Sequence, residues 1–432
     1  MRLLLKVNPF LHCTSISSVW RRIGIYPLSV GIHSMRLTCD MLQLRTFFKD
    51  LAMAIDFSLL PHTPCYICEE ELLERNLLTL DRVQRESGAK IILALKGFAM
   101  WSTFDQVGQY LHGCTASGLH EAKLAREKMN KEVHTYSPAF KDEDIDEIAR
   151  ISDDIVFNSP SQFHRYYERV KRINPSIKVS LRVNPEYSSS PVDLYNPCGL
   201  YSRLGTTLAN FDESILSKLD GLNFHALCEQ NVDALEGVLE AFESKFGSFI
   251  DGLQYVNFGG GHHITRVDYD VDRLIEVIRS FRERHNGITV YLEPGEAVGW
   301  QTGPLVASVL DIVRNGMDIA ILDTSAEAHM PDTLAMPYRA MVRGSGEAGE
   351  KAYTYRFGGN TCLAGDIMGD YSFDEPLKVG DKIVFEDQIH YTFVKNTTFN
   401  GIKLPSLAIW TKTGELKIVH EFGYEDYRNR LS

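Results

Sequence analysis

The sequence predicts an α/β protein in which a (β/α)8 TIM barrel is followed by an antiparallel β domain. Between residues 90 and 293, eight short apolar segments alternate with stretches of helical spacing. That alternation is typical of a barrel of parallel strands wrapped by helices. After about residue 310, short candidate strands follow one another without long helices between them, as in an antiparallel sheet. A chain of 432 residues is also too long for one simple core.

The eight predicted barrel strands are short and mostly apolar. They are residues 90–95, 110–116, 133–136, 154–158, 178–183, 222–227, 253–258 and 288–293. Helical spacing follows the second, third and fourth of them, at residues 120–130, 142–151 and 161–173. A doubly wound open sheet is the alternative fold. The eight repeated units, and the lack of a GxGxxG motif after the first strand, favour the barrel.

The predicted β domain draws on both ends of the chain. Its candidate strands are residues 317–323, 338–344, 352–359, 381–387, 391–395, 405–411 and 416–423. Residues 64–68, which precede the barrel, are expected to join them. We therefore predict an N-terminal segment contributing to the β domain at 53–89, the barrel at 90–309 and the C-terminal β domain at 310–432.

Residues 1–52 differ in composition from the rest. They carry seven Lys or Arg against only two acidic residues, Asp40 and Asp50. An organelle transit peptide has roughly this composition. A translated upstream region, with the true start at Met53, would look the same, and we favour this second interpretation. In either case the extension is expected to pack poorly.

Composition excludes several classes of partner. The net charge of −12 argues against a nucleic-acid binder, and no apolar stretch is long enough to cross a membrane. Eight cysteines over this length form no disulfide framework, which favours a reducing cytoplasm. Cys65 and Cys68 have CxxC spacing, but no second CxxC completes a zinc site, so we expect no bound metal.

Chemically capable residues follow the predicted barrel strands, where barrels of this kind place their active sites. The strand ends supply Lys96, Ser117, Ser137, Asn158, Arg182 with Asn184, His225, the run Gly259-Gly260-Gly261, and Glu293. Taken singly, each has an ordinary interpretation, such as a solvated lysine, a core histidine, a flexible loop or a strand stop. Taken together, an amine, an imidazole, a glycine loop and a carboxylate are all explained by one ligand, pyridoxal 5′-phosphate (PLP).

Each of these groups has a use in PLP chemistry. A lysine amine forms a Schiff base with the PLP aldehyde, and desolvation at a barrel mouth lowers its pKa toward reactivity. Consecutive glycines let backbone N–H groups approach a phosphate. An acid such as Glu293 keeps the pyridine nitrogen protonated, so that the ring accepts electrons. His225 is suited to stack on that ring, and Arg182 to bond its phenolic oxygen or to orient a neighbour.

Several motifs resemble the fold-type III PLP enzymes, the group of alanine racemase, ornithine decarboxylase and diaminopimelate decarboxylase. The resemblance covers about residues 60–425 and rests on ALKGFAMW, GCTASGLHEAKLA, HTYSPAFK, NPCGLYSRLG, NFHALCEQ, NFGGGHHIT and YLEPGEAVGWQTG. It implies that Lys96 carries PLP, His225 stacks on the ring and Glu293 contacts the pyridine nitrogen. It also assigns the phosphate to the loop of Gly259, Gly260 and Gly261.

The β domain contains further matches to this family. NTCLAGDIMGD, at 360–370, is similar to a cysteine motif that reaches into the partner subunit's active site, which implies a role for Cys362 and a homodimer. The same motif gives Asp366 as a substrate or structural contact. Tyr391, in HYTFVKNTTFNG, resembles a tyrosine that touches the phosphate. Asp323 resembles the aspartate that binds the substrate's distal amine.

The resemblance implies a lyase of polyamine biosynthesis that decarboxylates a carboxylated triamine. Many relatives have EPGR where this chain has EPGE, so Glu296 cannot bind phosphate as that arginine does and is expected to face the cationic substrate. Glu327 is a further candidate partner for the substrate amines. Leu363 follows Cys362, where diaminopimelate decarboxylases carry a glutamate, which counts against that substrate.

Three alternatives remain at this point. An amino-acid racemase would use the same lysine but needs a second acid or base on the opposite ring face. A diaminopimelate or ornithine decarboxylase would differ only in its substrate. A regulatory paralogue would keep the fold and lose the cofactor, although Lys96, His225, Glu293 and Cys362 are all present.

Overall fold

The structure, a computed structural model, describes residues 55–190, 193–335 and 337–432. Eight parallel strands close into a barrel in sequence order, because the last strand pairs with the first. The strands are β2 (Lys90–Ala94), β3 (Gly113–Ala116), β4 (Glu132–Tyr136), β5 (Asp154–Phe157), β6 (Lys178–Arg182), β7 (Gly221–Asn223), β8 (Tyr255–Asn257) and β9 (Thr289–Leu292). Each overlaps one of the eight strands predicted from the sequence, so the predicted barrel is confirmed.

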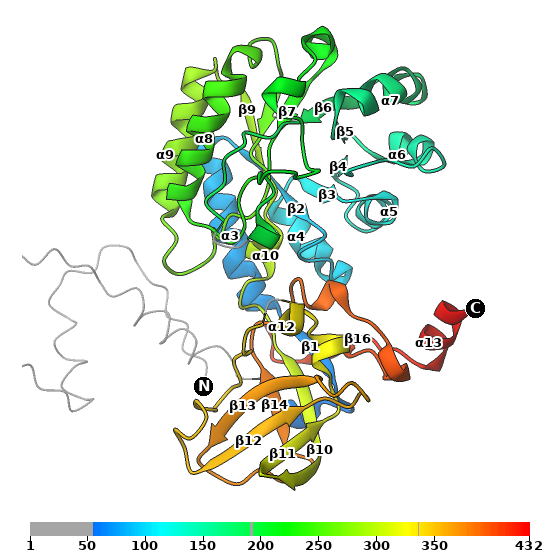
Figure 1. Ribbon diagram of the computed structural model, residues 1–432, viewed down its shortest axis with the longest axis vertical. Helices are drawn as coiled ribbons and strands as arrows, with labels where there is room; N and C mark the ends of the chain where they lie inside the picture. Colours follow the sequence, from blue (N-terminus) through cyan, green and yellow to red (C-terminus); the bar gives the residue numbers. More distant parts are fainter. Residues whose placement is uncertain (1–54, 191–192, 336) are drawn as a thin grey trace, which may run out of the picture. The chain divides into compact units, whose positions relative to one another are not determined.

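Helices surround the barrel strands (Figure 1). They are α3 (Glu70–Ser87), α4 (Phe104–Tyr110), α5 (Leu119–Lys128), α6 (Ile145–Ile151), α7 (Pro160–Ile173), α8 (Val232–Phe246) and α9 (Val271–Arg284). Helix α7 shows why these segments fold as they do. Ser159 caps its N-terminus and Pro160 occupies its first turn. Phe163, Tyr166 and Val170 then recur at helical spacing and bury one face.

The second region is an eight-stranded sheet with the order β13-β12-β11-β10-β1-β15-β16, and β14 also pairs with β10. Its strands are β1 (Cys65–Glu69), β10 (Leu305–Asn315), β11 (Met317–Leu322), β12 (Tyr353–Gly358), β13 (Ile367–Phe373), β14 (Lys382–Phe385), β15 (Ser406–Trp410) and β16 (Leu416–His420). Most pairs are antiparallel, as predicted, but β1 with β15 and β11 with β12 are parallel.

Two strands expected in this sheet are not strands. Residues 391–395 contain a short 3-10 helix, Phe393–Lys395, because Tyr391 has a positive φ of 32° and donates its N–H to Gly97 O. Residues 338–344 form turns with one isolated bridge at Val342. Two real strands, β10 and β13, were not predicted. Strand β10 also crosses the predicted boundary between residues 309 and 310, and the domain limits stay a prediction.

Strand β1 brings the start of the described chain into the centre of this sheet. It pairs with β10 on one side and with β15 on the other. Cys65 and Cys68 lie on this strand in two different hydrophobic clusters, and burial raises the pKa of the Cys65 thiol to about 12. The two thiols therefore face opposite sides of the sheet and do not form a shared site.

No helix in the described ranges is both long enough and apolar enough to cross a membrane. The extension predicted at residues 1–52 lies outside the described residues. For function, the important consequence of the fold is the closed parallel barrel. It gathers the carboxyl ends of eight strands, and the loops that follow them, at one mouth.

Candidate active site

Lys96 lies two residues beyond the end of β2, in the turn that begins the loop to α4. Its side chain is accessible to solvent, yet the barrel mouth surrounds it, so the amine stands in a concavity rather than on an open surface. This enclosure lowers the pKa of the lysine, and the positive charge of Arg182 lowers it further. A lowered pKa makes the amine a better nucleophile near neutral pH.

The three glycines that follow β8 pack tightly against the loops after β7 and β9. A Cβ on Gly259 would lie 2.4 Å from Phe224 O, one on Gly260 would lie 2.3 Å from Glu293 O, and one on Gly261 would lie 2.1 Å from Leu227 O. Gly259 and Gly261 also have positive φ angles of 71° and 84°. No other residue type fits this loop, which brings its backbone close to whatever the mouth holds.

Two of the glycine N–H groups are already engaged within the protein. Gly259 donates to Oδ1 of Asn257 at 2.8 Å, and Gly260 donates to Nδ1 of His225 at 2.8 Å. The predicted contact between this loop and the phosphate is therefore limited to Gly261 and the backbone that follows it. The first two glycines instead hold neighbouring side chains in place.

His225 lies two residues beyond β7 and is held in one tautomer. Because Nδ1 accepts the Gly260 N–H, the ring proton of the neutral imidazole is on Nε2. Burial lowers the pKa of His225 well below its usual value, and the nearby charges of Lys96 and Arg182 lower it further. A neutral, oriented ring is suited to stack on a flat aromatic ligand.

Glu293 follows β9 directly and is anchored from the neighbouring strand. Its Oε1 accepts a hydrogen bond of 2.7 Å from Nδ2 of Asn257, the last residue of β8. Its backbone N–H donates to Gly259 O at 2.8 Å. One amide side chain, that of Asn257, thus holds both the carboxylate and the start of the glycine loop.

Arg182, the last residue of β6, is buried in the same mouth. Its Nη2 donates to His225 O at 3.2 Å, and its guanidinium lies over the Tyr136 ring, 4.8 Å from the ring centre. Tyr136 in turn donates its hydroxyl to Asn158 at 2.8 Å. Arg182 therefore supplies a fixed positive charge beside Lys96 and His225.

Tyr391 reaches the mouth from the segment between β14 and β15. Its backbone N–H donates to Gly97 O at 2.8 Å, which ties it to the residue after Lys96. Burial raises the pKa of its phenol, and the charge of Glu296 adds to the effect. The hydroxyl therefore stays protonated and is available as a hydrogen-bond donor.

Glu296 begins the short helix α10 (Glu296–Gly299) and lies between two histidines. Its Oε2 lies 3.2 Å from His263 Nε2, and its Oε1 lies 3.7 Å from His390 Nδ1. Asp387 contacts the other ring nitrogen of His390 at 3.1 Å. Burial works against the charged form of His390, but Asp387 and Glu296 outweigh it and raise the pKa of this histidine.

Glu229, in the loop after β7, approaches the same cluster. Glu229, His263 and Glu296 each place one ligand atom within 4.8 Å of the others. Partial burial and the charge of Glu296 raise the pKa of Glu229. Its backbone has a positive φ of 53°, an uncommon conformation for a residue with a side chain. The cluster concentrates negative charge at the mouth, where a cationic group would be stabilised.

Two candidate carboxylates lie in the sheet region and are already occupied. Asp323 accepts hydrogen bonds from Thr63 Oγ1 at 2.5 Å and from the Ser308 N–H at 2.8 Å. Asp366 accepts from Ser325 Oγ and from the Ala326 N–H, and so caps the helix α11 (Ala326–His329). Both carboxylates help to build the loops of the sheet region, and their predicted contacts with substrate stay predictions.

Cys362 and Glu327 lie in the same region as those carboxylates. Cys362 is exposed, and its backbone N–H donates to Oδ1 of Asn400 at 2.7 Å. Within the described residues it has no hydrogen bond to Lys96 or to another group at the barrel mouth. Glu327 is half-buried in α11, with its backbone N–H directed at Asp366.

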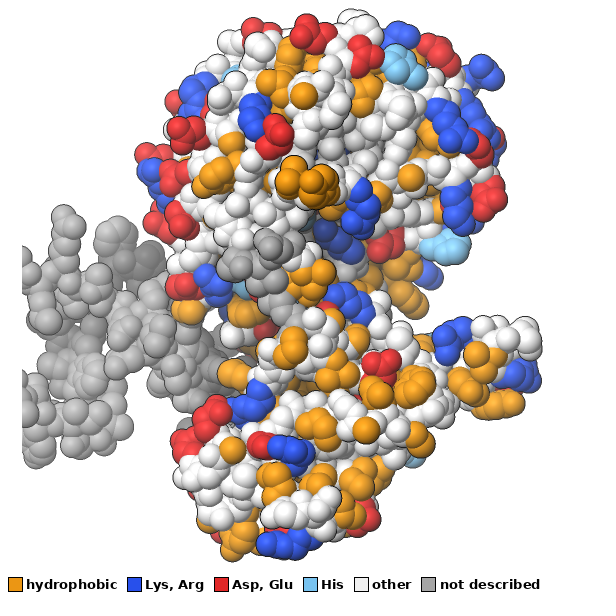
Figure 2. Space-filling model, in the orientation of Figure 1, with side chains coloured by type: hydrophobic (Ala, Val, Ile, Leu, Met, Phe, Trp, Pro, Cys, Tyr) orange, Lys and Arg blue, Asp and Glu red, His pale blue; other side chains and the backbone are white. Residues whose placement is uncertain are grey.

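Hydrophobic side chains gather over the sheet region (Figure 2). Two large ones are exposed close to Cys362 in the fold. Leu363 is the next residue, and Phe399 precedes the asparagine that binds the Cys362 backbone. A surface of this kind is suited to contact with another protein chain.

The residues gathered at the mouth fit PLP. The glycine loop has no room for a Cβ and so presents bare backbone, the amine of Lys96 is enclosed and accessible, and an anchored carboxylate faces the same mouth. The neutral His225 and the buried Arg182 complete a donor set suited to a flat ring that carries oxygen and nitrogen atoms. The sequence had placed all of these residues at strand ends.

Comparison with known proteins identifies the family. A model of the family described as "pyridoxal-dependent decarboxylase, C-terminal sheet domain" matches residues 40–388. The chain belongs to the pyridoxal-dependent decarboxylases. Its cofactor is therefore PLP, and the fold predicted from the sequence is that of this family of decarboxylases.

Several pyridoxal-dependent decarboxylases of known name are similar to this chain. A carboxynorspermidine/carboxyspermidine decarboxylase of Campylobacter jejuni is 54% identical over 379 residues, which cover 85% of this chain and 98% of the relative. A carboxyaminopropylagmatine decarboxylase of Synechocystis is 46% identical and covers 85% of this chain and 95% of the relative.

Solved structures of decarboxylases agree with these matches. A crystal structure of carboxynorspermidine decarboxylase from Campylobacter jejuni, complexed with norspermidine, has a TM-score of 0.80 and 52% identity, covering 85% of this chain and all of that one. A diaminopimelate decarboxylase from Helicobacter pylori, complexed with L-lysine, has a TM-score of 0.71 but only 15% identity, covering 89% of this chain and 99% of that one. The second likeness shows the shared fold alone.

Sequence reasoning missed several residues of this decarboxylase site. Asn257 directly precedes the segment FGGG, so its place at a strand end could have singled it out. His263 directly follows another histidine after the same glycines, which was also a visible signal. Glu229 and His390 gave no signal of this kind, because only the fold brings them to Glu296.

Proposed function

We propose that this enzyme removes the α-carboxylate of a carboxylated triamine, forming norspermidine from carboxynorspermidine, spermidine from carboxyspermidine, or both, in polyamine biosynthesis. The observation that carries the proposal is the 54% identity to a carboxynorspermidine/carboxyspermidine decarboxylase over 98% of that relative's length. The crystal structure with norspermidine supports it, since this chain covers all of that protein.

The residues at the barrel mouth are proposed to hold and orient the cofactor. Lys96 binds PLP covalently through its amine. His225 lies against one face of the ring as a neutral imidazole. Glu293, held by Asn257, contacts the pyridine nitrogen. Gly261 and Tyr391 contact the phosphate, and Arg182 contacts the phenolic oxygen or orients His225.

PLP, when bound, accepts the electron pair that the departing carboxylate leaves behind. The protein has to hold the scissile bond perpendicular to the ring, exclude water and return a proton to the α-carbon. We assign that proton transfer to Cys362 of the partner subunit. Cys362 is exposed, and in the described residues it has no hydrogen bond to Lys96 of its own chain, which supports this assignment. The assignment requires a homodimer with shared active sites, and the exposed Leu363 and Phe399 support such a contact.

The carboxylates at the mouth are proposed to receive the substrate's ammonium groups. Glu296 and Glu229 stand close together, and within the described ranges no lysine or arginine forms an ion pair with either. A cationic amine between them would relieve the repulsion that raises the pKa of Glu229. Asp323, Glu327 and Asp366 stay predicted substrate contacts, and in a shared site they would act on the partner's substrate.

The Synechocystis relative supports a second candidate substrate. That protein is named a carboxyaminopropylagmatine decarboxylase and is 46% identical to this chain. Its substrate therefore belongs in any test of specificity. The amino-acid racemase, the ornithine or diaminopimelate decarboxylase and the regulatory paralogue gain no comparable support from the named relatives.

The experiment that tests the proposal is mass spectrometry of the purified protein incubated with PLP and one substrate at a time. Carboxynorspermidine, carboxyspermidine and carboxyaminopropylagmatine are offered in parallel, with ornithine and diaminopimelate as controls. Loss of CO₂ from a carboxylated triamine is the expected result, and the faster substrate defines the specificity. No loss from any of the three carboxylated polyamines, with PLP bound, would refute the proposal.

We also place the enzyme in the cytoplasm. The six cysteines in the described residues are all free, including the exposed Cys362. Free thiols in a shared active site are compatible with a reducing compartment.

A further inference from the structure

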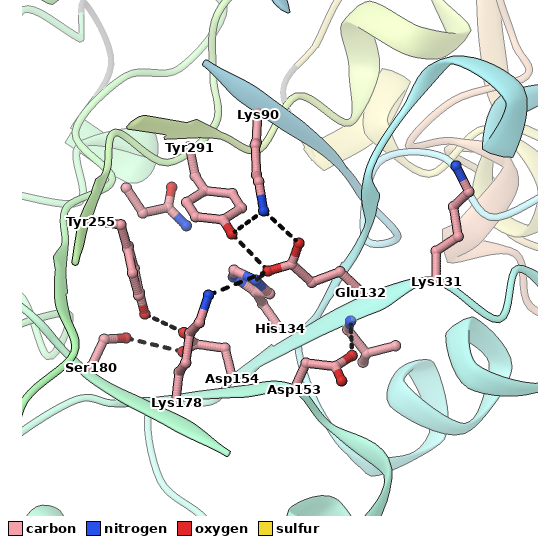
Figure 3. A network of polar contacts seen from close by, with 12 residues as sticks. Lys90, Lys131, Glu132, His134, Asp153, Asp154, Lys178, Ser180, Tyr255 and Tyr291 are labelled. Carbon is pink, nitrogen blue, oxygen red and sulfur yellow. Dashed lines mark hydrogen bonds and ion pairs between the residues drawn. The ribbon is translucent and has the colours of Figure 1, made fainter. Parts of the chain in front are cut away.

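Inside the barrel, directly below the mouth, lies a layer of polar side chains that the proposed chemistry does not use (Figure 3). We call it the polar layer. It consists of Glu132 and His134 of β4, Asp154 of β5, Ser180 of β6, Tyr255 of β8 and Tyr291 of β9.

Hydrogen bonds link the members of the polar layer. His134 Nε2 lies 3.0 Å from Glu132 Oε1, and that same oxygen accepts the Tyr291 hydroxyl at 2.6 Å. Tyr255 donates its hydroxyl to one oxygen of Asp154, and Ser180 donates to the other at 3.3 Å. His134 and Asp154 are completely buried. Branched apolar side chains dominate the interior of most such barrels, so buried ionisable groups here are unusual.

The polar layer is in register with the active site. Side chains two residues apart on a strand point to the same face. Four members of the layer each precede a site residue by two positions on the same strand or just beyond it. These pairs are His134 with Tyr136, Ser180 with Arg182, Tyr255 with Asn257 and Tyr291 with Glu293. The polar layer therefore lies directly beneath the cofactor-binding residues, inside the barrel.

His134 occupies the centre of the polar layer. Its ring centre lies 4.8 Å from that of Tyr291 and 6.3 Å from that of Tyr255. In the described part of the chain, its Nδ1 has no hydrogen-bond partner. Burial disfavours the charged ring, but Asp154, Glu132 and Glu293 together outweigh burial and raise the pKa of His134. The ring thus packs against Tyr291, which precedes Glu293 by two residues at the end of β9.

Two lysines complete the charge balance at the outer end of the layer. Lys90 Nζ lies 3.4 Å from Glu132 Oε2 and donates to the Tyr291 hydroxyl at 3.2 Å. Lys178 Nζ lies 4.0 Å from Glu132 Oε1. Glu132 therefore has cations on both sides, with the lysines toward solvent and His134 toward the site. Removing charges from water destabilises the folded state even when they are paired, so filling space alone does not explain the polar layer.

We propose that His134 is a positioning residue of the cofactor site: its ring, which contacts Glu132 and packs against Tyr291, holds the end of β9 in place so that Glu293 is directed at the pyridine nitrogen. The inference rests on the proposed function only through the role of Glu293. It assigns His134 no contact with substrate or cofactor. Removing its ring moves Glu293 and so changes the environment of the bound cofactor.

The test compares His134→Gln with the wild-type holoenzyme by two measurements. The first is the absorption spectrum of bound PLP, without substrate, between about pH 6 and about pH 9. We expect its pH dependence to shift, because Glu293 is no longer held in the same position beside the pyridine nitrogen. The second is kcat, which we expect to fall about tenfold, as is usual when a partner of a site residue is removed.

A double-mutant cycle shows whether His134 acts through Glu293. In a Glu293→Gln background, His134→Gln is expected to change the remaining kcat less than about twofold, since the group it supports is gone. Tyr166→Phe is the control. It removes a buried hydrogen bond of helix α7, outside the polar layer, and its spectrum should follow that of the wild type.

Three outcomes would overturn the inference. One is an unchanged spectrum and kcat in a folded His134→Gln protein. Another is the same tenfold loss in the Glu293→Gln background, and the third is a spectral shift of equal size in Tyr166→Phe. If His134→Gln does not fold, the isosteric Glu132→Gln, which changes the contact partner of the His134 ring, is judged by the same criteria. The spectrum needs no substrate, so the inference stays testable even if wild-type enzyme decarboxylates none of the proposed substrates.

Discussion

The backbone N–H of Gly260 donates a 2.8 Å hydrogen bond to Nδ1 of His225. This bond joins the loop after β8 to the loop after β7 and fixes the orientation and tautomer of the imidazole. It also shows that the glycine run has two tasks. Its bare backbone is proposed to contact the ligand. One of its amides also holds the His225 ring, which is proposed to lie against that ligand.

Gly260→Ala should disrupt both tasks. The new Cβ would lie 2.3 Å from Glu293 O, so the loop has to move and the bond to His225 is lost. We expect PLP affinity to fall at least about tenfold, measured by equilibrium dialysis. Gly423→Ala is the control, because a Cβ there meets open space. Unchanged PLP affinity in Gly260→Ala would show that the packing of this loop does not matter for the cofactor.

Lys96→Ala should abolish the covalent bond to PLP and nearly all turnover. The enclosed amine is the nucleophile proposed for the cofactor, and we expect kcat to fall at least about a thousandfold. Mass spectrometry of the reduced holoenzyme measures the covalent bond directly. Lys96→Arg is the control for charge, since it keeps the cation but cannot form that bond. Near-normal turnover in the alanine variant would refute the role of Lys96.

Cys362→Ala should slow or misdirect the return of the proton while leaving PLP bound. Chiral analysis of product formed in deuterated water measures that step. Cys198→Ser serves as a control at a half-buried thiol. If the site is shared, mixing Lys96→Ala and Cys362→Ala subunits should restore up to about a quarter of wild-type activity, because one site of each mixed dimer is intact. No recovery from dimers shown to be mixed would contradict a shared site.

Glu296→Gln should weaken binding of the triamine more than it slows the chemistry. The side chain stays the same size beside His263 and His390, but one of the two negative charges of the Glu229 and Glu296 pair is lost. We expect KM to rise about tenfold with kcat changed by less than about threefold. The same measurements with added EDTA show whether a metal ion takes part. An unchanged KM would place the substrate's amines elsewhere.

Asp387→Asn should change how stability depends on pH. Asp387 helps to raise the pKa of the buried His390, so protonated His390 stabilises the folded state. That contribution is complete below the unfolded pKa of about 6.5 and is lost as pH rises through the higher folded pKa. Melting temperatures of variant and wild type should therefore differ most at about pH 6 and converge at alkaline pH. A difference that does not vary with pH would show that Asp387 acts only through neutral hydrogen bonds.

The barrel and the residues at its mouth could be predicted because local patterns specify them. Each parallel strand is a short apolar run, and a polar residue such as Lys96 or Glu293 stands out where the run ends. The sheet region is harder to predict because its pairs join distant segments. The run at 391–395 has the composition of a strand, yet the bond from Tyr391 to Gly97 turns it into a loop of the active site.

The carboxylates of the candidate site show the same limit of prediction from sequence. Asp323 and Asp366 look like ligand-binding residues in the sequence, but in the described chain their oxygens accept hydrogen bonds from their own loops. Glu229 and His390 gave no comparable signal, because they reach Glu296 from two separate loops, one after β7 and one between β14 and β15. Spacing along the chain identifies residues on one strand, whereas a cluster of this kind depends on how loops fold toward one another.

The position of β1 between β10 and β15 has a consequence for synthesis of the chain on the ribosome. Strand β1 is made before the barrel, but its partner β15 is made only near the end of translation. All eight barrel strands emerge earlier, so the barrel can close while the sheet still lacks a neighbour for β1. A nascent chain therefore carries β1 without its β15 partner through most of its synthesis, and a chain released before residue 406 leaves that edge of β1 unpaired.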